Sequence, residues 1–474
     1  MKRLVCACVA ILGSAGAAAA QSSGELAELS LAAGYKAAFI CSGVFNAGRT
    51  PEQIAGDELH RAYPNLRDEL AALPDAEIDE RKKIVTVAFD ERQPPRVSAW
   101  RPHLGCAQLP TGADPEMVDR LPKAKVRMTR DLPRPLPRAL IEDKAFVDTA
   151  AAAFDRKTYG EGTETTAVLV LKDGEVVAER YREGFGPDVS QRTWSVAKSI
   201  AATVIGAAVA EGHFDLEADE NDGLRVADKA GLAAWSAPGD PRGEITLDNL
   251  LRMASGLDST PAGNRTDDVY FGGGRVVDHA ITRRKVAVPG ENWRYANNDT
   301  MAAICALRER MDDDEKFWRF PFERVLHPIG MRNTYLETDW NGDFVLSSQV
   351  WTTAPDLARL GLLYLNDGVW NGRRILPERW VEYVSSPHPA QPPAARANGD
   401  PYAGYGAQFW LFGERFDLPA GSYAALGNRG QHVMIIPERN VVIVRRGFDE
   451  VGGTRFDIAA FSRDVLAALS DASE

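Results

Sequence analysis

The chain lacks the features that mark several large classes of protein. Its 474 residues include five cysteines and seven histidines, and acidic residues outnumber basic ones by 67 to 55, giving a net charge of -12. Without a positive excess there is no electrostatic footprint for a nucleic acid, so we predict no nucleic-acid partner. With 45% hydrophobic and 26% charged residues, the composition is that of a folded globular protein and excludes extensive disorder.

Patterns for metal and nucleotide binding are also missing. The sequence has no His-Glu-x-x-His pair, no Walker loop and no Gly-x-Ser-x-Gly segment. The acidic run 312–315 lacks the spacing of a calcium loop, so we interpret it as a solvated helix end. The glycines of 271–274 lack the strand-to-helix setting of a nucleotide site. The seven histidines are scattered. The sequence therefore predicts no metal and no cofactor.

A long apolar run occurs at the very start of the chain. Lys2 and Arg3 precede an Ala-rich stretch that ends in Ala18-Ala19-Ala20, before polar residues. This pattern predicts a secretory signal peptide over 1–20, cleaved after Ala20. A retained membrane anchor is the alternative, although the run is marginal in length for a span. We expect a bacterial periplasmic or secreted protein with no membrane span once the signal is removed.

Removal of that segment would leave three cysteines. Cys41 and Cys106 lie beside turn-like, glycine-containing sequence, whereas Cys305 lies in an apolar helical run. An oxidising compartment permits disulfides, so we predict a Cys41–Cys106 bridge, with Cys305 buried and free. In the chain-entropy description, closing a loop of that size stabilises the fold by about 4 kcal/mol.

The rest of the chain divides into three zones. We predict an N-terminal extension over 21–130 that contains a helix-like stretch at 51–73, a proline-rich linker over 131–143, and one mixed α/β domain over 144–474. Strand patterns stand near both ends of this domain, and helical or loop sequence fills its middle. These features predict one antiparallel sheet flanked by helices, with an inserted helical lobe. The expected strands lie at 166–171, 175–180, 432–436 and 441–444, and a closing helix lies at 456–469.

The most informative element is the helix expected after Trp194. It opens with Ser195-Val-Ala-Lys198, and residues three apart on a helix share one face. The helix macrodipole opposes positive charge at this end, so a buried Lys198 should have a depressed pKa and could accept the proton of Ser195. Ser-x-x-Lys also occurs by chance. Its position at the start of a helix, soon after a strand pair, favours the catalytic interpretation.

Several further motifs follow in a fixed order. They are Leu250-Leu-Arg-Met-Ala-Ser-Gly-Leu257, Pro289-Gly-Glu-Asn-Trp-Arg-Tyr-Ala-Asn297, Pro328-Ile-Gly-Met331 and Thr353-Ala-Pro-Asp-Leu-Ala358. Together with Ser-x-x-Lys they resemble the penicillin-recognising serine hydrolases. The similarity is to the branch related to class C β-lactamases, which includes 6-aminohexanoate-dimer hydrolases and family VIII-type esterases. It implies the β-lactamase/transpeptidase-like fold and leaves the first 110 or so residues outside the shared unit.

The resemblance also implies roles for individual residues. Ser195 would be the nucleophile, Lys198 its general base, and Tyr295 the relay that protonates the leaving group and helps to activate water. Asn297 would bond Lys198 and the substrate. Ser255 has no lysine or histidine partner nearby, so we interpret Ser255-Gly256 as a turn.

The third motif of the family departs from its usual form. The family has Lys-Thr-Gly or His-x-Gly, whereas this chain has Ala425-Leu426-Gly427. Gly427 would still allow close backbone approach, and the N–H of Asn428 could join that of Ser195 in an oxyanion hole. Arg429 could replace the missing cation or face solvent, and Gln431 could line the site.

One further residue near this motif is a histidine. We expect the side chain of His432 to pack in the protein interior rather than to take part in the active site.

We therefore predict a secreted serine hydrolase that cleaves an ester or amide bond of a small molecule through an acyl-enzyme. One alternative is a peptidoglycan D-amino-acid peptidase or weak β-lactamase, which the missing cation disfavours. Another is a non-catalytic protein that binds cell-wall fragments, which the complete Ser195, Lys198 and Tyr295 set disfavours. The oligomeric state stays open, and specificity is expected in the loops 260–275 and 386–402.

Overall fold

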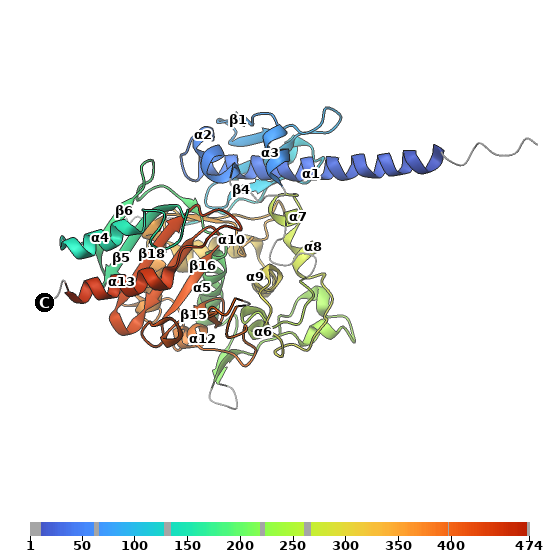
Figure 1. The fold of residues 1–474 in the computed structure, drawn as a ribbon. Helices are drawn as coiled ribbons and strands as arrows, with labels where there is room; N and C mark the ends of the chain where they lie inside the picture. The colour runs from blue at the N-terminus through green and yellow to red at the C-terminus, as the bar shows by residue number, and fades with distance from the viewer. Residues whose placement is uncertain are drawn as a thin grey trace, which may run out of the picture.

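The central feature of the fold is one antiparallel sheet. The computed structural model describes residues 11–60, 66–127, 134–218, 223–259, 267–396 and 398–471. Within these ranges the main sheet has seven strands, in which β18 from the end of the chain pairs with β5 from its first half, as expected (Figure 1). The strand order is β14 (Gly404–Tyr405), β15 (Trp410–Leu411), β16 (Tyr423–Gly427), β17 (Gln431–Ile436), β18 (Val441–Gly447), β5 (Thr165–Lys172) and β6 (Glu175–Tyr181).

Helices cover both faces of this sheet. Along β17, Val433 and Ile435 point to one face, and Met434 and Ile436 point to the other, as the period of two in a strand requires. The first face packs against α5 (Val196–Ala210) and α11 (Ala354–Leu365). The second face packs against α4 (Lys144–Ala152) and α13 (Ile458–Asp471), which confirms the predicted closing helix.

A helical lobe is inserted between β6 and β14, on the side of α5 that faces away from the sheet (Figure 1). Its longest helix is α9 (Asn297–Met311), which packs on α5. The other helices are α6 (Leu247–Leu251), α7 (Asp267–Tyr270), α8 (Val276–Ala280), α10 (Asp314–Phe320), the π-helical turn η6 (Pro321–Leu326) and α12 (Trp380–Ser385). One small three-stranded sheet completes the unit, in the order β10 (Tyr335–Leu336), β11 (Val350–Thr352) and β7 (Gln191–Arg192). Two strand pairs are also present: β8 (Leu216–Ala218) with β9 (Leu224–Val226), and β12 (Val369–Trp370) with β13 (Arg373–Arg374).

The N-terminal extension lies across one end of this unit (Figure 1). Its long helix α1 (Ile11–Phe45) packs on a four-stranded sheet of β1 (Glu77–Asp79), β2 (Ile84–Val87), β3 (Arg96–Arg101) and β4 (Gly105–Gln108). Tyr35 and Phe39 of α1 enter the same hydrophobic core as Trp194 and Phe271 of the larger unit. The ring centroids of Tyr35 and Phe271 are 4.5 Å apart, and those of Phe39 and Trp194 are 6.2 Å apart. The extension therefore shares its core with the rest of the molecule.

The predicted disulfide is confirmed. Cys41 and Cys106 are bonded, and Cys305 is a buried free thiol. The expectation of a turn at Cys41 is wrong, because α1 continues through it to Phe45. Gly43 serves close packing there: a Cβ at this position would lie 2.5 Å from the side chain of Ile54.

The stretch at 51–73 contains helix in separate pieces. They are α2 (Pro51–Ile54), a π-helical turn η1 (Ala55–Leu59) and α3 (Arg67–Ala72), and 61–65 lie outside the described residues. The described part of the proline-rich linker runs along the edge of the main sheet, where Val176 N donates to Pro137 O at 2.8 Å and Ala139 N donates to Val176 O at 3.0 Å. The predicted domain boundaries themselves stay predictions.

The predicted signal peptide is only partly within the described residues. Residues 1–10 lie outside them, and the predicted cleavage point after Ala20 falls within α1. No helix in the described ranges is both long and apolar enough to cross a membrane. Secretion stays a prediction.

Candidate active site

The turn before α5 determines where Ser195 lies. Trp194 has a φ of 51°, a left-handed conformation that is rare for a bulky residue. This turn follows β7 and brings Ser195 to the N-cap of α5. The helix is buried from Val196 to Ala208, so its apolar residues fix it in the core on all sides. The predicted nucleophile therefore stands on a rigid element.

Lys198 reaches Ser195 as the helical spacing predicts. Its Nζ lies 3.2 Å from Ser195 Oγ, 2.7 Å from Asn297 Oδ1 and 2.7 Å from the carbonyl oxygen of Ser347. The side chain is buried, and desolvation lowers the pKa of Lys198 to about 7. A substantial fraction of the amine is then neutral at neutral pH.

These three contacts orient the lone pair of the neutral amine. An uncharged lysine has two N–H bonds, and the carbonyl oxygens of Asn297 and Ser347 can accept both of them. The lone pair then faces the remaining partner, the hydroxyl of Ser195, which donates its proton along the 3.2 Å contact. This is the arrangement that a general base for Ser195 requires.

Tyr295 lies next to both Ser195 and Lys198. Its hydroxyl shares a hydrogen bond with that of Ser195, and Lys198 Nζ lies 5.0 Å from the centre of its ring. Burial raises the pKa of Tyr295 well above its usual value, so the phenol stays protonated near neutral pH. Tyr295 can then donate a proton or a hydrogen bond, which leaves the base role to Lys198.

A cluster of aromatic rings that the sequence analysis missed surrounds Tyr295. The centroid of Trp410 lies 5.4 Å from that of Tyr295, and Tyr405 lies 6.0 Å from it. Trp293 and Tyr402 extend the cluster through Trp410, at 6.1 Å and 5.8 Å. We call Trp293, Tyr402, Tyr405 and Trp410 the aromatic wall. Tyr402 comes from one of the predicted specificity loops, whereas 260–266 of the other loop lie outside the described residues.

Gly427 occupies the close-approach position that the sequence predicts. A Cβ there would lie 2.2 Å from the carbonyl oxygen of Thr193 and 3.2 Å from the backbone nitrogen of Ser195. Any side chain would therefore force the end of β16 away from the nucleophile. Asn428 follows directly, and its Oδ1 accepts a hydrogen bond from the N–H of Arg429 at 3.0 Å. The place of Asn428 in an oxyanion hole stays a prediction.

Arg429 behaves in neither of the two ways that we considered. Its side chain is buried, and its Nη1 donates to Glu58 Oε2 of the extension at 2.7 Å. It therefore neither faces solvent nor supplies a free cation to the site. The reason was not visible locally, because Glu58 is 371 residues away in sequence.

The side chain of Gln431 contacts the backbone of the same turn, at Arg429. Its Nε2 donates to the carbonyl oxygens of Arg429 at 3.1 Å and Gly447 at 2.5 Å, and its Oε1 accepts from Arg446 Nε at 2.6 Å. These contacts favour a role in supporting the turn, and substrate binding by Gln431 stays a prediction.

Two other residues take the structural roles that we favoured. Ser255 Oγ donates to Asp299 Oδ1 at 2.8 Å and accepts from the N–H of Leu257 at 3.1 Å, which suits a turn. His432 points to the face of the sheet covered by Phe456, away from α5, and burial lowers its pKa to about 3.

The acidic run also has a structural role. Within 312–315, Asp313 is the N-cap of α10, and Asp314 forms an ion pair with Arg308 at 2.7 Å.

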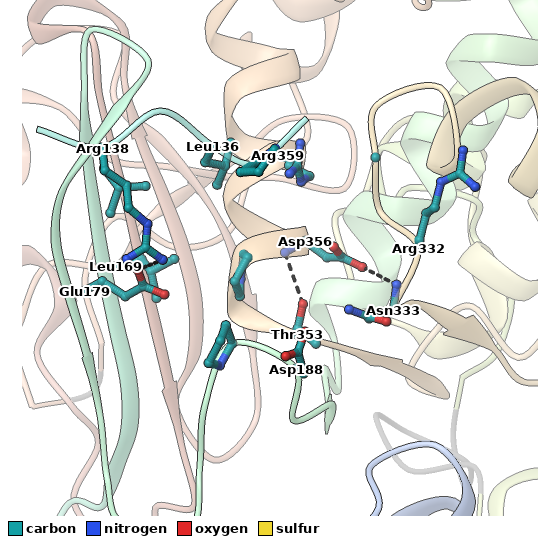
Figure 2. Close-up of a pocket in the computed structure, with 15 residues that line it drawn as sticks. Leu136, Arg138, Leu169, Glu179, Asp188, Arg332, Asn333, Thr353, Asp356 and Arg359 are labelled. Carbon is teal, nitrogen blue, oxygen red and sulfur yellow. Dashed lines mark hydrogen bonds and ion pairs between the residues drawn. The ribbon is translucent and has the colours of Figure 1, made fainter. Parts of the chain in front are cut away.

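A cavity of about 260 Å³ lies apart from Ser195 (Figure 2). It is bordered by the linker, by β5 and β6, and by the start of α11. Arg138 and Glu179 form an ion pair in its wall, and Asp356 accepts from the N–H of Asn333 at 2.9 Å. None of the catalytic candidates lines the cavity.

Comparison with known proteins defines the class. The Beta-lactamase family matches residues 150–445, more than half of the chain, so the chain belongs to that family. It is a serine hydrolase with the β-lactamase/transpeptidase-like fold.

Three individual proteins illustrate what this chain is similar to. The 6-aminohexanoate-dimer hydrolase of Paenarthrobacter ureafaciens is 29% identical over 304 residues, which span 60% of this chain and 73% of that enzyme. A Bacillus anthracis structure provisionally named as a 6-aminohexanoate-dimer hydrolase is 22% identical with a TM-score of 0.55, over 73% of this chain and 89% of that one. A family VIII carboxylesterase is 16% identical with a TM-score of 0.52, over 72% of this chain and 99% of that one. The two structures support the fold.

Proposed function

We propose that this enzyme hydrolyses an ester or amide bond of a small molecule through an acyl-enzyme on Ser195. The observation that carries the proposal is the buried Lys198 amine, 3.2 Å from Ser195 Oγ and with a pKa lowered to about 7. A lysine in this setting is a base at neutral pH, and its proton donor is the adjacent serine hydroxyl.

The proposed reaction has two halves. Ser195 Oγ attacks the substrate carbonyl as its proton passes to Lys198, and the tetrahedral oxyanion is bound by the N–H groups of Ser195 and Asn428. Tyr295 protonates the leaving alcohol or amine and is reprotonated from Lys198, which leaves the acyl-enzyme. Water then gives a proton to the same pair of residues and attacks the acyl carbon, and Ser195 regains its proton as the carboxylic acid departs.

The residues around the site favour a substrate that has no negative charge next to the third motif, Ala425-Leu426-Gly427. Because Arg429 is paired with Glu58, it is not available to bind a substrate carboxylate. The aromatic wall offers apolar and ring contacts beside Tyr295 instead. We therefore propose esters and linear amides ahead of β-lactams and D-amino-acid peptides, which carry that carboxylate. We further propose that the enzyme acts in the periplasm or outside the cell after removal of 1–20.

A substrate panel tests this proposal. Wild-type protein, Ser195→Ala and Lys198→Ala would be assayed with short p-nitrophenyl esters, a linear amide and a chromogenic cephalosporin. We expect wild-type ester or amide turnover, at least 10³-fold loss in both variants, and weak or no cephalosporin cleavage. Preferential cephalosporin cleavage would favour the β-lactamase alternative, and no turnover of any substrate would favour the binding-protein alternative.

A further inference from the structure

The turn that follows the third motif is held by a residue from outside the family's shared region. Arg429 Nη1 donates to Glu58 Oε2 at 2.7 Å, and Arg429 Nη2 donates to the carbonyl oxygen of Asp57 at 2.6 Å. Both acceptors lie in η1 of the extension, whereas the family match begins at residue 150. Each side chain of the Glu58–Arg429 pair is only 1% exposed.

The geometry of the pair leaves Arg429 little freedom. Its Nε also donates to the carbonyl oxygen of Asp449 at 3.2 Å, and its guanidinium carbon lies 5.1 Å from the centre of the Phe448 ring. The backbone of Arg429 is left-handed, with a φ of 58°. A buried guanidinium needs a compensating anion, because leaving it unpaired carries a large desolvation cost. Glu58 is the acidic partner: burial raises the pKa of its carboxyl, and the charges of Arg429 and Arg49 oppose that rise.

The same turn is coupled to the nucleophile. Asn428 stands between Arg429 and Gly427, and Gly427 is so close to Ser195 that a Cβ would lie 3.2 Å from the Ser195 nitrogen. A shift of Arg429 therefore shifts the N–H that would bind the oxyanion. Small displacements of such donors are costly, because the transition state depends on their placement before reaction.

The extension contacts the nucleophile turn at a second point. The guanidinium carbon of Arg192 lies 3.9 Å from the centre of the Trp194 ring and 4.9 Å from that of Phe39 in α1. Trp194 directly precedes Ser195. The extension thus supports both backbone segments that would form the oxyanion hole.

We propose that Glu58 is a positioning residue for catalysis: through its pair with Arg429, the N-terminal extension holds the Asn428 turn in the geometry that acylation requires. This inference rests on the proposed function, and it assigns the extension a role in the reaction.

A double-mutant cycle tests the inference. Glu58→Ala, Arg429→Met and the double variant would be made in the full-length protein, and kcat and KM would be measured with p-nitrophenyl butyrate. We expect each of the three to lower kcat at least tenfold with less than a threefold change in KM. The double variant should be no worse than either single variant, because all three remove the same contact. Glu58→Asp should recover part of the lost kcat.

A matched control separates positioning from stability. Glu337 is also a buried glutamate that joins the two parts: it accepts from Ser42 Oγ at 2.5 Å, Asn46 Nδ2 at 3.0 Å and the N–H of Cys106 at 3.2 Å. Glu337→Ala should lower the melting temperature yet leave kcat within about twofold at 25 °C. If Glu58→Ala does not fold, Glu58→Gln replaces it, since it removes the charge and keeps the shape.

The outcomes are distinct. Wild-type kcat in a folded Glu58→Ala or Glu58→Gln variant, or equal losses of kcat in the Glu58 and Glu337 variants, would overturn the inference. Additive losses in the cycle would also overturn it. Failure of the wild-type protein to react with a fluorophosphonate at Ser195 would instead overturn the proposed function.

Discussion

The chemistry depends on one lysine whose partners are all uncharged. Among the described residues, Lys198 contacts a hydroxyl, a side-chain amide and a backbone carbonyl, so no carboxylate in contact with it there offsets its burial. This is why the pKa of Lys198 is lowered while the lysine stays within reach of Ser195. The Ser-x-x-Lys spacing made the Ser195 contact predictable. The carbonyl of Ser347 was not predictable, because a backbone acceptor leaves no mark in the sequence.

The lowered pKa of Lys198 predicts the pH dependence of the reaction. The active form is the deprotonated amine, so kcat/KM should be low at acidic pH and rise as the pH passes the lysine pKa of about 7. With one controlling group, the increase between pH 5 and pH 8 should be roughly 100-fold. Steady-state kinetics with an uncharged ester measure it. A flat profile, or one that falls as the pH rises, would contradict the role of Lys198 as base.

Among the elements, the local ones were the most predictable. The hairpins at 165–181 and 431–447 have short apolar runs joined by short turns, and α5 has an apolar sequence and a clear start. The aromatic wall was missed because Trp293, Tyr402 and Trp410 come from segments that only the tertiary fold brings together. The glycine at position 43 also suggested a turn, but Gly43 lies within α1, where the absence of a side chain lets Ile54 pack closely.

The contact between β16 and α5 predicts the effect of a single methyl group. In Gly427→Ala, the new Cβ would lie 2.2 Å from the carbonyl oxygen of Thr193, so the strand must move away from Ser195. We expect kcat/KM to fall by roughly 100-fold, the scale of a lost oxyanion donor. Gly186→Ala is the control, since a Cβ there meets nothing within 4 Å, and its activity should equal that of the wild type. Full activity in Gly427→Ala would show that this close approach is not needed.

At the scale of the whole molecule, the N-terminal extension could be predicted from the sequence, but the way it packs on the catalytic unit could not. The predicted appendage shares a core with the catalytic unit through Phe39 and Trp194, and it places Glu58 against Arg429. Both contacts join residues far apart in sequence, so no local pattern could reveal them. The Cys41–Cys106 bond was predictable, because it depended on the number of cysteines and on their surroundings.

Removal of that disulfide should weaken the extension first. The bond joins residues 65 apart, and its loss should lower the free energy of unfolding by about 2–4 kcal/mol. Thermal and urea unfolding of the Cys41→Ala, Cys106→Ala double variant measure the change, with Cys305→Ala as the control for loss of a buried sulfur. An unchanged unfolding midpoint, or three reactive thiols in the denatured, unreduced protein that lacks residues 1–20, would contradict the assignment.

The most direct test of the account is covalent labelling of Ser195. Protein would be incubated with a fluorescent fluorophosphonate, and the modified peptide would be identified by mass spectrometry, for the wild type, Ser195→Ala and Lys198→Ala. We predict one adduct on Ser195 in the wild type, none in Ser195→Ala, and labelling at least 100-fold slower in Lys198→Ala. An adduct on another serine, or retained labelling of Ser195→Ala, would contradict the central claim that Ser195 is the nucleophile.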